Sequence, residues 1–306
     1  MDPLSDILGL LKPESYITAG FDAGGTWAVR FAGQSGRIKC YAITRGQCWL
    51  SVDGVPDPIL LHTGDCFVLP TGRGFTLASD LGVEPLSARD VFAGARYGGV
   101  VIHQGGGDVF LTGSRFDVDA RQAGLLLGSL PPLIHIEAAG DQAAFRWLIE
   151  RMMEEARGAR AGASLAAHHL AQLMLLQALR LFLSRRPLGG VGWFFALADP
   201  RLSSALGAMH ADPGRRWTLE ALARLAGMSR SVFAQRFRKA VGETPIAYLA
   251  RWRMLLAVEQ LAQGRTSLVQ TAAALGYESE NAFNTAFKRI LGCSPRRYVR
   301  LRMEAA

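Results

Sequence analysis

Two short stretches near the end of the sequence carry side chains whose chemistry suits the recognition of DNA. Each combines amides, hydroxyls and basic groups at intervals that place them on one side of a helix. The first stretch supplies Arg230, Ser231, Ala234, Gln235 and Arg238, and the second supplies Glu280, Asn281, Asn284, Thr285 and Lys288. Amides and hydroxyls can hydrogen-bond base edges in a major groove, and basic groups can bind phosphates. These residues predict a site for double-stranded DNA.

The positive charge of the chain is concentrated in the same region. Residues 199–306 hold 17 Lys and Arg against 8 Asp and Glu, a net charge of +9. Residues 1–198 hold 17 against 18, a net charge of −1. A single polar helix face is better interpreted as an ordinary solvated surface. Two such faces within one basic third of the chain favour a polyanion as the partner.

An internal repeat contains both stretches. With an offset of 50 residues, Leu225 matches Leu275, Ser229 matches Ser279, Phe233 matches Phe283, Phe237 matches Phe287, Gly242 matches Gly292, Thr244 matches Ser294 and Pro245 matches Pro295. Such self-similarity indicates a duplicated supersecondary unit.

Each copy of the repeat is predicted to be a helix, a turn and a second helix. We expect Thr218 and Ser267 to cap the first helices, and Ser229 and Ser279 the second, because their hydroxyls can accept from the free N–H groups at a helix start. The buried stripes of the second helices are then Val232, Phe233 and Phe237 in one copy, and Phe283 and Phe287 in the other.

A further helix is predicted to join the two copies, from Thr244 to a stop at Gly264. At 1.5 Å per residue it would be roughly 28 Å long. Adjacent major grooves on one face of DNA lie about 34 Å apart. The connecting helix therefore has about the length needed to set two reading heads in successive grooves.

The first half of the chain has the pattern of an all-β barrel or sandwich. Between Trp27 and Leu77, short apolar runs rich in β-formers alternate with Gly, Pro and Asp turns. Five aromatic residues there are candidates for the lining of a ligand pocket: Trp27, Tyr41, Trp49, Phe67 and Phe75. The alternative for each of them is a place in the core.

Helical periodicity replaces the strand pattern after Pro132 and predicts helices over 141–157 and over 164–186, the second capped by Ser164. We therefore expect a β domain at 1–140, a helical dimerisation region and linker at 141–198, and an all-α domain with two helix-turn-helix units at 199–306. The helix over 164–186 carries an apolar stripe, which favours a homodimer and consists of Leu165, Gln172/Leu173, Leu176, Leu179 and Leu183. Packing of that stripe on the subunit's own β domain is the alternative.

The C-terminal repeat resembles the DNA-binding domain of AraC/XylS transcription regulators. The resemblance covers residues 200–302 and rests on the segments Trp217–Ser229, Phe233–Tyr248 and Gly276–Arg300. It implies a transcription factor that reads two groove segments per subunit, with RNA polymerase as a further partner if it is an activator. It also implies base contacts from Ser231, Ala234, Gln235, Asn281, Asn284 and Thr285, and phosphate contacts from Arg230, Arg238 and Lys288.

Residues 20–110 resemble the cupin-type sensor domain of such regulators, chiefly through the segment Gly64–Gly72. This resemblance implies that the domain senses a small molecule or a redox signal. Cys40, Cys48 and Cys66 are the candidate redox residues, with Cys40 and Cys48 expected on adjacent strands. The alternative is that the cysteines are small buried hydrophobic residues.

One departure from the cupin pattern bears on metal binding. Phe75 stands where metal-binding cupins carry a histidine, and the other motif region reads Lys39-Cys40-Tyr41 without a His-x-His pair. We therefore expect no metal, no cofactor and no enzymatic activity. A cupin metalloenzyme fused to a DNA-binding domain is the alternative, and stoichiometric metal in the purified protein would support it.

The sequence gives no sign of a membrane or of export. No apolar run approaches the 18 or so residues that a spanning helix needs. The stretch Met1–Leu11 is acidic and lacks the basic region that opens a secretory signal. We expect a cytoplasmic protein without a membrane partner.

Overall fold

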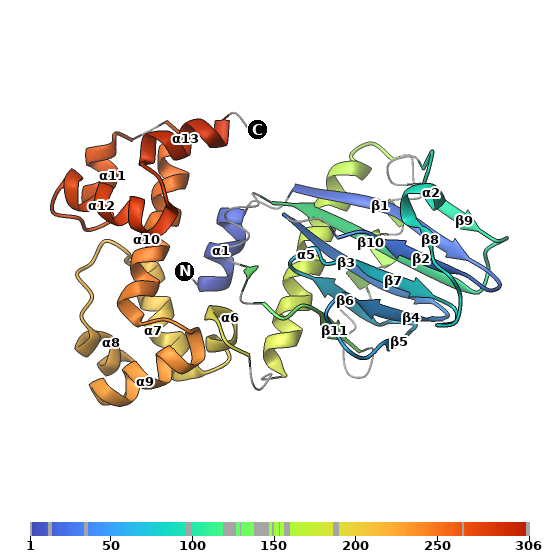
Figure 1. Ribbon diagram of the computed structural model, residues 1–306, viewed down its shortest axis with the longest axis horizontal. Coiled ribbons are helices and arrows are strands. Elements are labelled where there is room, and N and C mark those ends of the chain that lie inside the picture. Colours follow the sequence, from blue (N-terminus) through green and yellow to red (C-terminus); the bar gives the residue numbers. More distant parts are fainter. Residues whose placement is uncertain are drawn as a thin grey trace. The chain divides into compact units, whose positions relative to one another are not determined.

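The computed structural model describes residues 2–11, 14–33, 36–95, 99–118, 127–128, 130–137, 147–148, 150–152, 154–155, 160–185, 190–264 and 266–303. The chain forms two compact units, whose elements are labelled in Figure 1. One unit is Pro13–Pro187, and the other combines Met1–Lys12 with Leu188–Ala306. Among the described residues, the helix Pro3–Leu11 packs with the C-terminal helices, and the helix Ala163–Ser184 packs on the β-strands.

Two β-sheets form the first unit. The order in the six-stranded sheet is β11 (Ile134–Ile136), β6 (Cys66–Leu69), β3 (Arg37–Arg45), β10 (Val109–Asp117), β1 (Glu14–Ala23) and β9 (Val100–His103). The order in the five-stranded sheet is β5 (Ile59–His62), β4 (Gln47–Val52), β7 (Phe75–Ala78), β2 (Ala28–Phe31) and β8 (Leu86–Ser87). The sequence pattern allowed either a barrel or a sandwich. The strands pair into two separate sheets and do not form a single closed barrel.

The core of this unit lies between the two sheets. Alternate residues of β3 and β4 point inward, so that Tyr41 and Ile43 of β3 meet Leu50 and Val52 of β4 in one buried apolar cluster. Phe21 joins them from β1 and is fully buried. Burying a side chain of this size stabilises a fold by about 1.5–3 kcal/mol. The period-two pattern read from the sequence is therefore the pattern that builds this core.

A long helix covers the other face of the six-stranded sheet. α5 (Ala163–Ser184) packs on β1, β6 and β11. The helix predicted over 164–186 is confirmed, but its N-cap is Gly162, at φ +81°, and not Ser164. Of the helix predicted over 141–157, the described residues are helical and include buried Leu148 and Met152, whereas the others lie outside the described part of the chain.

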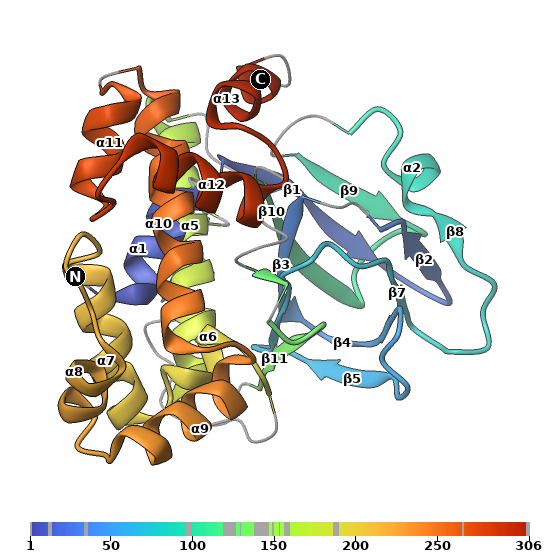
Figure 2. The same cartoon turned by 60° about the vertical axis from the view of Figure 1, so that its left-hand side comes forward.

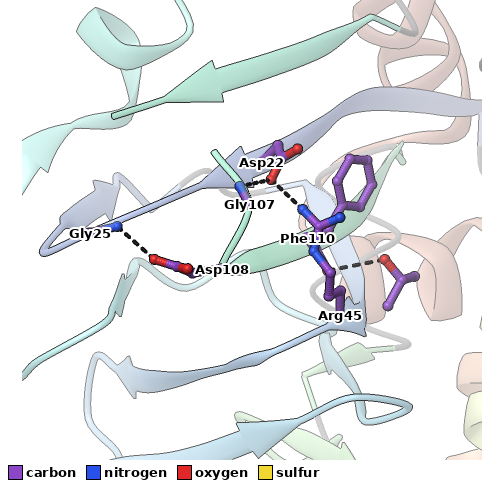
Figure 3. A network of polar contacts seen from close by, with 7 residues as sticks. Asp22, Gly25, Arg45, Gly107, Asp108 and Phe110 are labelled. Atoms are coloured by element: carbon purple, nitrogen blue, oxygen red, sulfur yellow. Dashed lines mark hydrogen bonds and ion pairs between the residues drawn. The ribbon is translucent and has the colours of Figure 1, made fainter. Parts of the chain in front are cut away.

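Polar contacts hold the glycine-rich turn before β10 against two other strands, as Figure 3 shows. Asp22 Oδ1 accepts from the backbone N–H of Gly107 at 2.9 Å and from Arg45 Nη2 at 2.7 Å. Asp108 Oδ2 accepts from the backbone N–H of Gly25 at 2.8 Å. These contacts fix the connection from β9 to β10 at one end of the domain.

Helices α6 (Trp193–Ala196), α7 (Pro200–Ala211), α8 (Leu219–Leu225), α9 (Arg230–Val241), α10 (Pro245–Ala262), α11 (Leu268–Ala274), α12 (Glu280–Leu291) and α13 (Pro295–Met303) build the second unit together with α1 (Pro3–Leu11). Figures 1 and 2 show α8 and α9 at one end of α10, and α11 and α12 at the other. The two predicted helix-turn-helix units and their connecting helix are confirmed.

The first helix of the chain completes the core of this second unit. α1 packs on α7 and α10 and buries Leu4, Ile7, Leu10 and Leu11. Because the contact joins residues about 200 positions apart, local sequence patterns do not indicate it.

A buried polar chain links α1 to α10. His210 of α7 has its Nδ1 at 3.1 Å from Asp6 Oδ2 and its Nε2 at 2.7 Å from the Tyr248 hydroxyl. The ring stacks on Trp252 with the ring centroids 4.0 Å apart. Burial lowers the pKa of His210 to about 3, so the imidazole is neutral at pH 7. In that state it can donate to Asp6 and accept from Tyr248.

Candidate nucleic-acid interface

The helix starts in the two helix-turn-helix units are capped as the sequence predicts. Thr218 accepts from the backbone N–H of Ala221 at 3.1 Å, and Ser229 accepts from Val232 at 3.4 Å. The side chains of Ser267 and Gln270 form a reciprocal capping box at the start of α11. Ser279 accepts from the N–H of Ala282 at 3.2 Å and caps α12. These caps satisfy N–H groups that a helix start leaves free.

The two units are not related by one constant offset. The N-caps of the first helices, Thr218 and Ser267, lie 49 residues apart, whereas those of the second helices, Ser229 and Ser279, lie 50 apart. The turn between α11 and α12 is therefore one residue longer than the turn between α8 and α9. The match of Leu225 with Leu275 is consequently wrong, since Leu225 is 49% exposed and Leu275 only 1%.

The second helix of each unit has one buried and one exposed side. Phe233 and Phe237 of α9, and Phe283 and Phe287 of α12, are fully buried, as predicted. Val232 was expected in the buried stripe of α9, but its side chain is 52% exposed. It lies one position before Phe233 and therefore turns about 100° away from it. Val232 is thus an additional candidate for contact with DNA.

The structure places most of the predicted DNA-binding residues on the exposed sides. In the first unit Arg230, Ser231, Gln235 and Arg238 are exposed, whereas Ala234 is half-buried. In the second unit Glu280, Asn281, Thr285 and Lys288 are exposed, whereas Asn284 is half-buried. Since the same positions are exposed in both units, α9 and α12 present equivalent faces.

The hydroxyl of Thr285 has an internal partner. It donates to the backbone carbonyl of Asn281 at 2.9 Å, one turn earlier in α12. This bond uses the proton of the hydroxyl and leaves its oxygen as an acceptor. A contact from Thr285 to a base is therefore limited to acceptance from a base amino group or to the methyl group.

Some basic side chains of the C-terminal helical unit are neutralised by carboxylates, whereas others near the exposed faces of α9 and α12 are not. Arg216, Arg224, Arg236 and Arg251 form ion pairs with carboxylates, and Arg236 pairs with Asp199 at 2.7 Å. Five exposed cations on α9 and α12 form no ion pair with any carboxylate in the described ranges. They are Arg230, Arg238, Lys239, Lys288 and Arg289. Because no internal anion neutralises them, these five cations are available to phosphates. Lys239 and Arg289 were not predicted, although both follow predicted phosphate contacts directly in the sequence.

Helix α10 sets the distance between the two exposed faces. It begins with Thr244 as N-cap and Pro245 in its first turn, as predicted, and spans 18 residues. Its length is then roughly 27 Å, which suits two heads in grooves about 34 Å apart.

Four of the five aromatic residues that were candidates for a pocket lining lie together in the β-sheet domain. Trp27, Tyr41, Phe67 and Phe75 belong to the buried cluster between the sheets, and the rings of Tyr41, Phe67 and Phe75 contact one another. Trp49 does not belong to this cluster. It is half-buried and alternates along β4 with the inward-facing Cys48.

The cysteines are arranged differently from the expectation. Cys40 and Cys48 were expected on adjacent strands, but β3 and β4 lie in different sheets. Cys40 instead has its Sγ 3.7 Å from that of Cys66, because β3 pairs with β6. Burial raises the pKa of Cys48 to about 12 and raises that of Cys66, which keeps both thiols protonated. The thiolate needed for fast reaction with an oxidant is thus disfavoured.

Two features are absent from the part of the chain that the structure describes. No group of three or more His, Cys, Asp or Glu side chains there is arranged to hold a metal ion. No described helix combines the length and the apolar character that crossing a membrane requires.

Comparisons with known proteins agree with the two-unit architecture. A family model described as a cupin matches residues 2–184, and one described as a helix-turn-helix domain matches residues 222–301. An AraC-like transcription regulator of Streptomyces lividans is 44% identical over 299 residues, 97% of this chain and 98% of that protein. The regulator AlkR of Acinetobacter baylyi is 31% identical over 281 residues, 90% of this chain and 91% of that protein.

Among solved structures, a match is the DNA-binding domain of AdpA in complex with a target DNA. It is 31% identical, covers 34% of this chain and 92% of that chain, and has a TM-score of 0.31. The family assignment rests on the full-length relatives and on the cupin match, which spans more than half of the sequence. The chain therefore belongs to the AraC-like transcription regulators, DNA-binding proteins in which a cupin domain precedes a helix-turn-helix domain.

Proposed function

We propose that α9 and α12 are the recognition helices and that they enter two successive segments of the major groove. The observation that carries this proposal is the equivalence of their exposed faces at the two ends of α10. In helix-turn-helix proteins the second helix of the unit lies in the groove and the first crosses the backbone. The test is whether substitutions in one helix change base preference only in its own segment.

The roles of the side chains follow from their hydrogen-bonding groups. Gln235 in the first unit, and Asn281 or Asn284 in the second, can each form a bidentate contact with adenine. Val232 and Ala234 offer only apolar contact, for example with a thymine methyl group. Further base contacts are assigned to Ser231, Glu280 and Thr285, and phosphate contacts to Arg230, Arg238 and Lys288.

A small molecule is the signal that the cupin domain is best suited to sense. Trp27 Nε1 and His103 Nε2 are buried, and neither has a hydrogen-bond partner in the described parts of the protein. Both rings contact Phe21, with centroid distances of 5.2 Å for Trp27 and 5.9 Å for His103. A buried donor without a partner costs about 1–3 kcal/mol. A neutral aromatic molecule with a carbonyl or hydroxyl oxygen would supply the missing acceptor.

Trp27→Phe is expected to remove a preference for an oxygen-bearing probe. We expect the full chain to bind 2-acetylnaphthalene about tenfold more tightly than naphthalene, because only the first can accept from Trp27 Nε1. The variant keeps an aromatic ring and should bind both probes equally, as isothermal titration would measure. Trp49→Phe, outside the buried cluster, is the matched control and should retain the preference. Equal binding of both probes by the wild-type chain would exclude this site.

This ligand-sensing role favours a regulator over an enzyme. A cupin metalloenzyme needs a set of metal ligands, whereas the buried cluster between the sheets is apolar and aromatic. The protected state of Cys48 and Cys66 likewise favours a ligand over an oxidant as the signal. If the regulator activates transcription, RNA polymerase is its further partner.

Helix α5 leaves part of its apolar stripe exposed to solvent. Of the predicted stripe, Leu179 is buried, but Leu165 is 62% exposed and Leu173 39% exposed. These two residues lie two turns apart on one face of the helix. We expect a homodimer that buries this face, and Leu165→Asp with Leu173→Asp should convert it to a monomer.

Sedimentation of the full chain at tens of micromolar, with and without DNA, measures this outcome. The control is Leu86→Asp, because Leu86 is also exposed, at 54%, but lies on β8. A wild-type chain that sediments as a monomer under both conditions would disprove the dimer.

A further inference from the structure

Arg253 of α10 connects the two helix-turn-helix units. Its Nε donates to the carbonyl of Pro213 at 2.6 Å, and its Nη2 donates to the carbonyl of Arg215 at 2.8 Å. Both carbonyls belong to the loop that leads into α8. The guanidinium also lies over the ring of Tyr277, 5.6 Å from its centroid, in the turn between α11 and α12. One side chain thus holds the entry to the first unit and the turn of the second.

The backbones of these two segments touch directly at a pair of glycines. A Cβ at Gly276 would lie 2.1 Å from the carbonyl oxygen of Gly214, and a Cβ at Gly214 would lie 2.4 Å from that of Ala274. Gly276 also has φ +77°, a conformation that other residues rarely adopt. No side chain fits between the segments, so their approach is fixed at backbone contact.

The extra residue in the second turn lies at the same junction. The turn between α11 and α12 is one residue longer than its counterpart, and Glu278 within it forms an ion pair with Arg216 of the loop before α8. The loop itself is braced, since Trp217 Nε1 donates to the Asp212 carbonyl at 2.8 Å. The longer turn, which breaks the exact repeat, is therefore the part of the second helix-turn-helix unit that contacts the first.

We propose that this junction, formed by Arg253, Gly214, Arg216 and the turn Gly276–Glu278, fixes the spacing of the two DNA segments that the protein accepts. The inference rests on the proposed reading of two segments by α9 and α12. Arg253 acts as a positioning residue: it locks the second unit against the first and prevents α12 from rotating about α10. The partner it selects is duplex DNA whose two recognition segments are separated by one particular number of base pairs.

The experiment measures binding of the full chain to three duplexes. One carries the site selected from a random pool, and the other two have one base pair inserted or removed between its segments. One base pair shifts the second segment by about 3.4 Å and about one tenth of a turn. We expect the wild-type chain to prefer the selected spacing by at least about tenfold. In Arg253→Met the preference should fall to about threefold or less, because two charged hydrogen bonds of the junction are lost.

A duplex with a single segment separates positioning from general damage. Arg253→Met should bind this duplex as the wild-type chain does, whereas an unstable DNA-binding unit would lose affinity for every duplex. Arg251→Met is the matched control, since Arg251 lies on the same helix but pairs with Glu243, just before the start of α10. If Arg253→Met does not fold, Arg253→Lys replaces it, because lysine keeps the charge and can reach only one carbonyl.

Each failure has a separate signature. An unchanged spacing preference in a folded Arg253 variant overturns the role of the junction and leaves the two-segment reading intact. A wild-type chain that binds all three duplexes equally overturns the junction as well. If the wild-type chain also binds a single segment as tightly as the full site, the proposed reading of two segments by α9 and α12 is itself disproved.

Discussion

Raising the salt concentration from 50 to 200 mM is expected to weaken the binding of this protein to duplex DNA by about 40-fold or more. Each phosphate contact contributes about −0.9 to the slope of log affinity against log salt. Three assigned contacts, from Arg230, Arg238 and Lys288, give a slope of about −2.7. These side chains are exposed and have no ion pair among the described carboxylates, so phosphates are their natural partners.

Lys288→Ala tests this assignment on one residue. The slope should become shallower by about 0.9, and binding to specific and random DNA should weaken alike. Arg89→Ala removes an exposed cation from the cupin domain and should leave the slope unchanged. Filter binding or fluorescence anisotropy at several salt concentrations measures both variants. A full chain whose affinity is the same at low and high salt would contradict the phosphate contacts.

Ile7→Ala is expected to destabilise the helical unit that contains both helix-turn-helix motifs by about 2–5 kcal/mol. Residue 7 belongs to this unit, although the other helices of the unit follow almost 200 residues later in the sequence. Ile7 is 1% exposed and packs with α1 against α7 and α10. Truncation leaves a cavity there and loses the contacts that fill it. Calorimetry of the full chain should show the unfolding transition of this unit at lower temperature, with that of the cupin domain unchanged.

Val269→Ala provides the comparison within the same unit. Val269 is 60% exposed on α11, so its truncation should change the free energy of unfolding by less than about 0.5 kcal/mol. If Ile7→Ala behaves like this control, α1 does not contribute to the core of the unit that contains the helix-turn-helix motifs.

The features that the sequence predicts well are those set by short-range chemistry. Ser229 and Ser279 cap helices because a hydroxyl next to a helix start has free N–H groups within reach. Phe233 and Phe237 are buried because the spacing of four places them on one side. The same reasoning failed by one position at Val232, since adjacent residues differ in direction by about 100°.

The features that the sequence does not reveal depend on contacts between distant segments. The link from Asp6 to His210 and the contact between Gly214 and Gly276 exist only once the chain has folded. The cysteine neighbours were misjudged for the same reason. Pairing Cys40 with Cys66 requires the strand order, which alternation along single strands does not determine.

The central claim is that α9 and α12 each read their own groove segment, and selection of bound sequences from a random pool tests it most directly. Gln235→Ala should relax preference at one position of the first segment, at a cost of roughly 1–3 kcal/mol there. Asn284→Ala, or Asn281→Ala, should do so about ten base pairs away. Each variant should leave the other segment unchanged. Selected sequences that match those of the wild-type chain for all three variants would contradict the assignment of these faces to the bases.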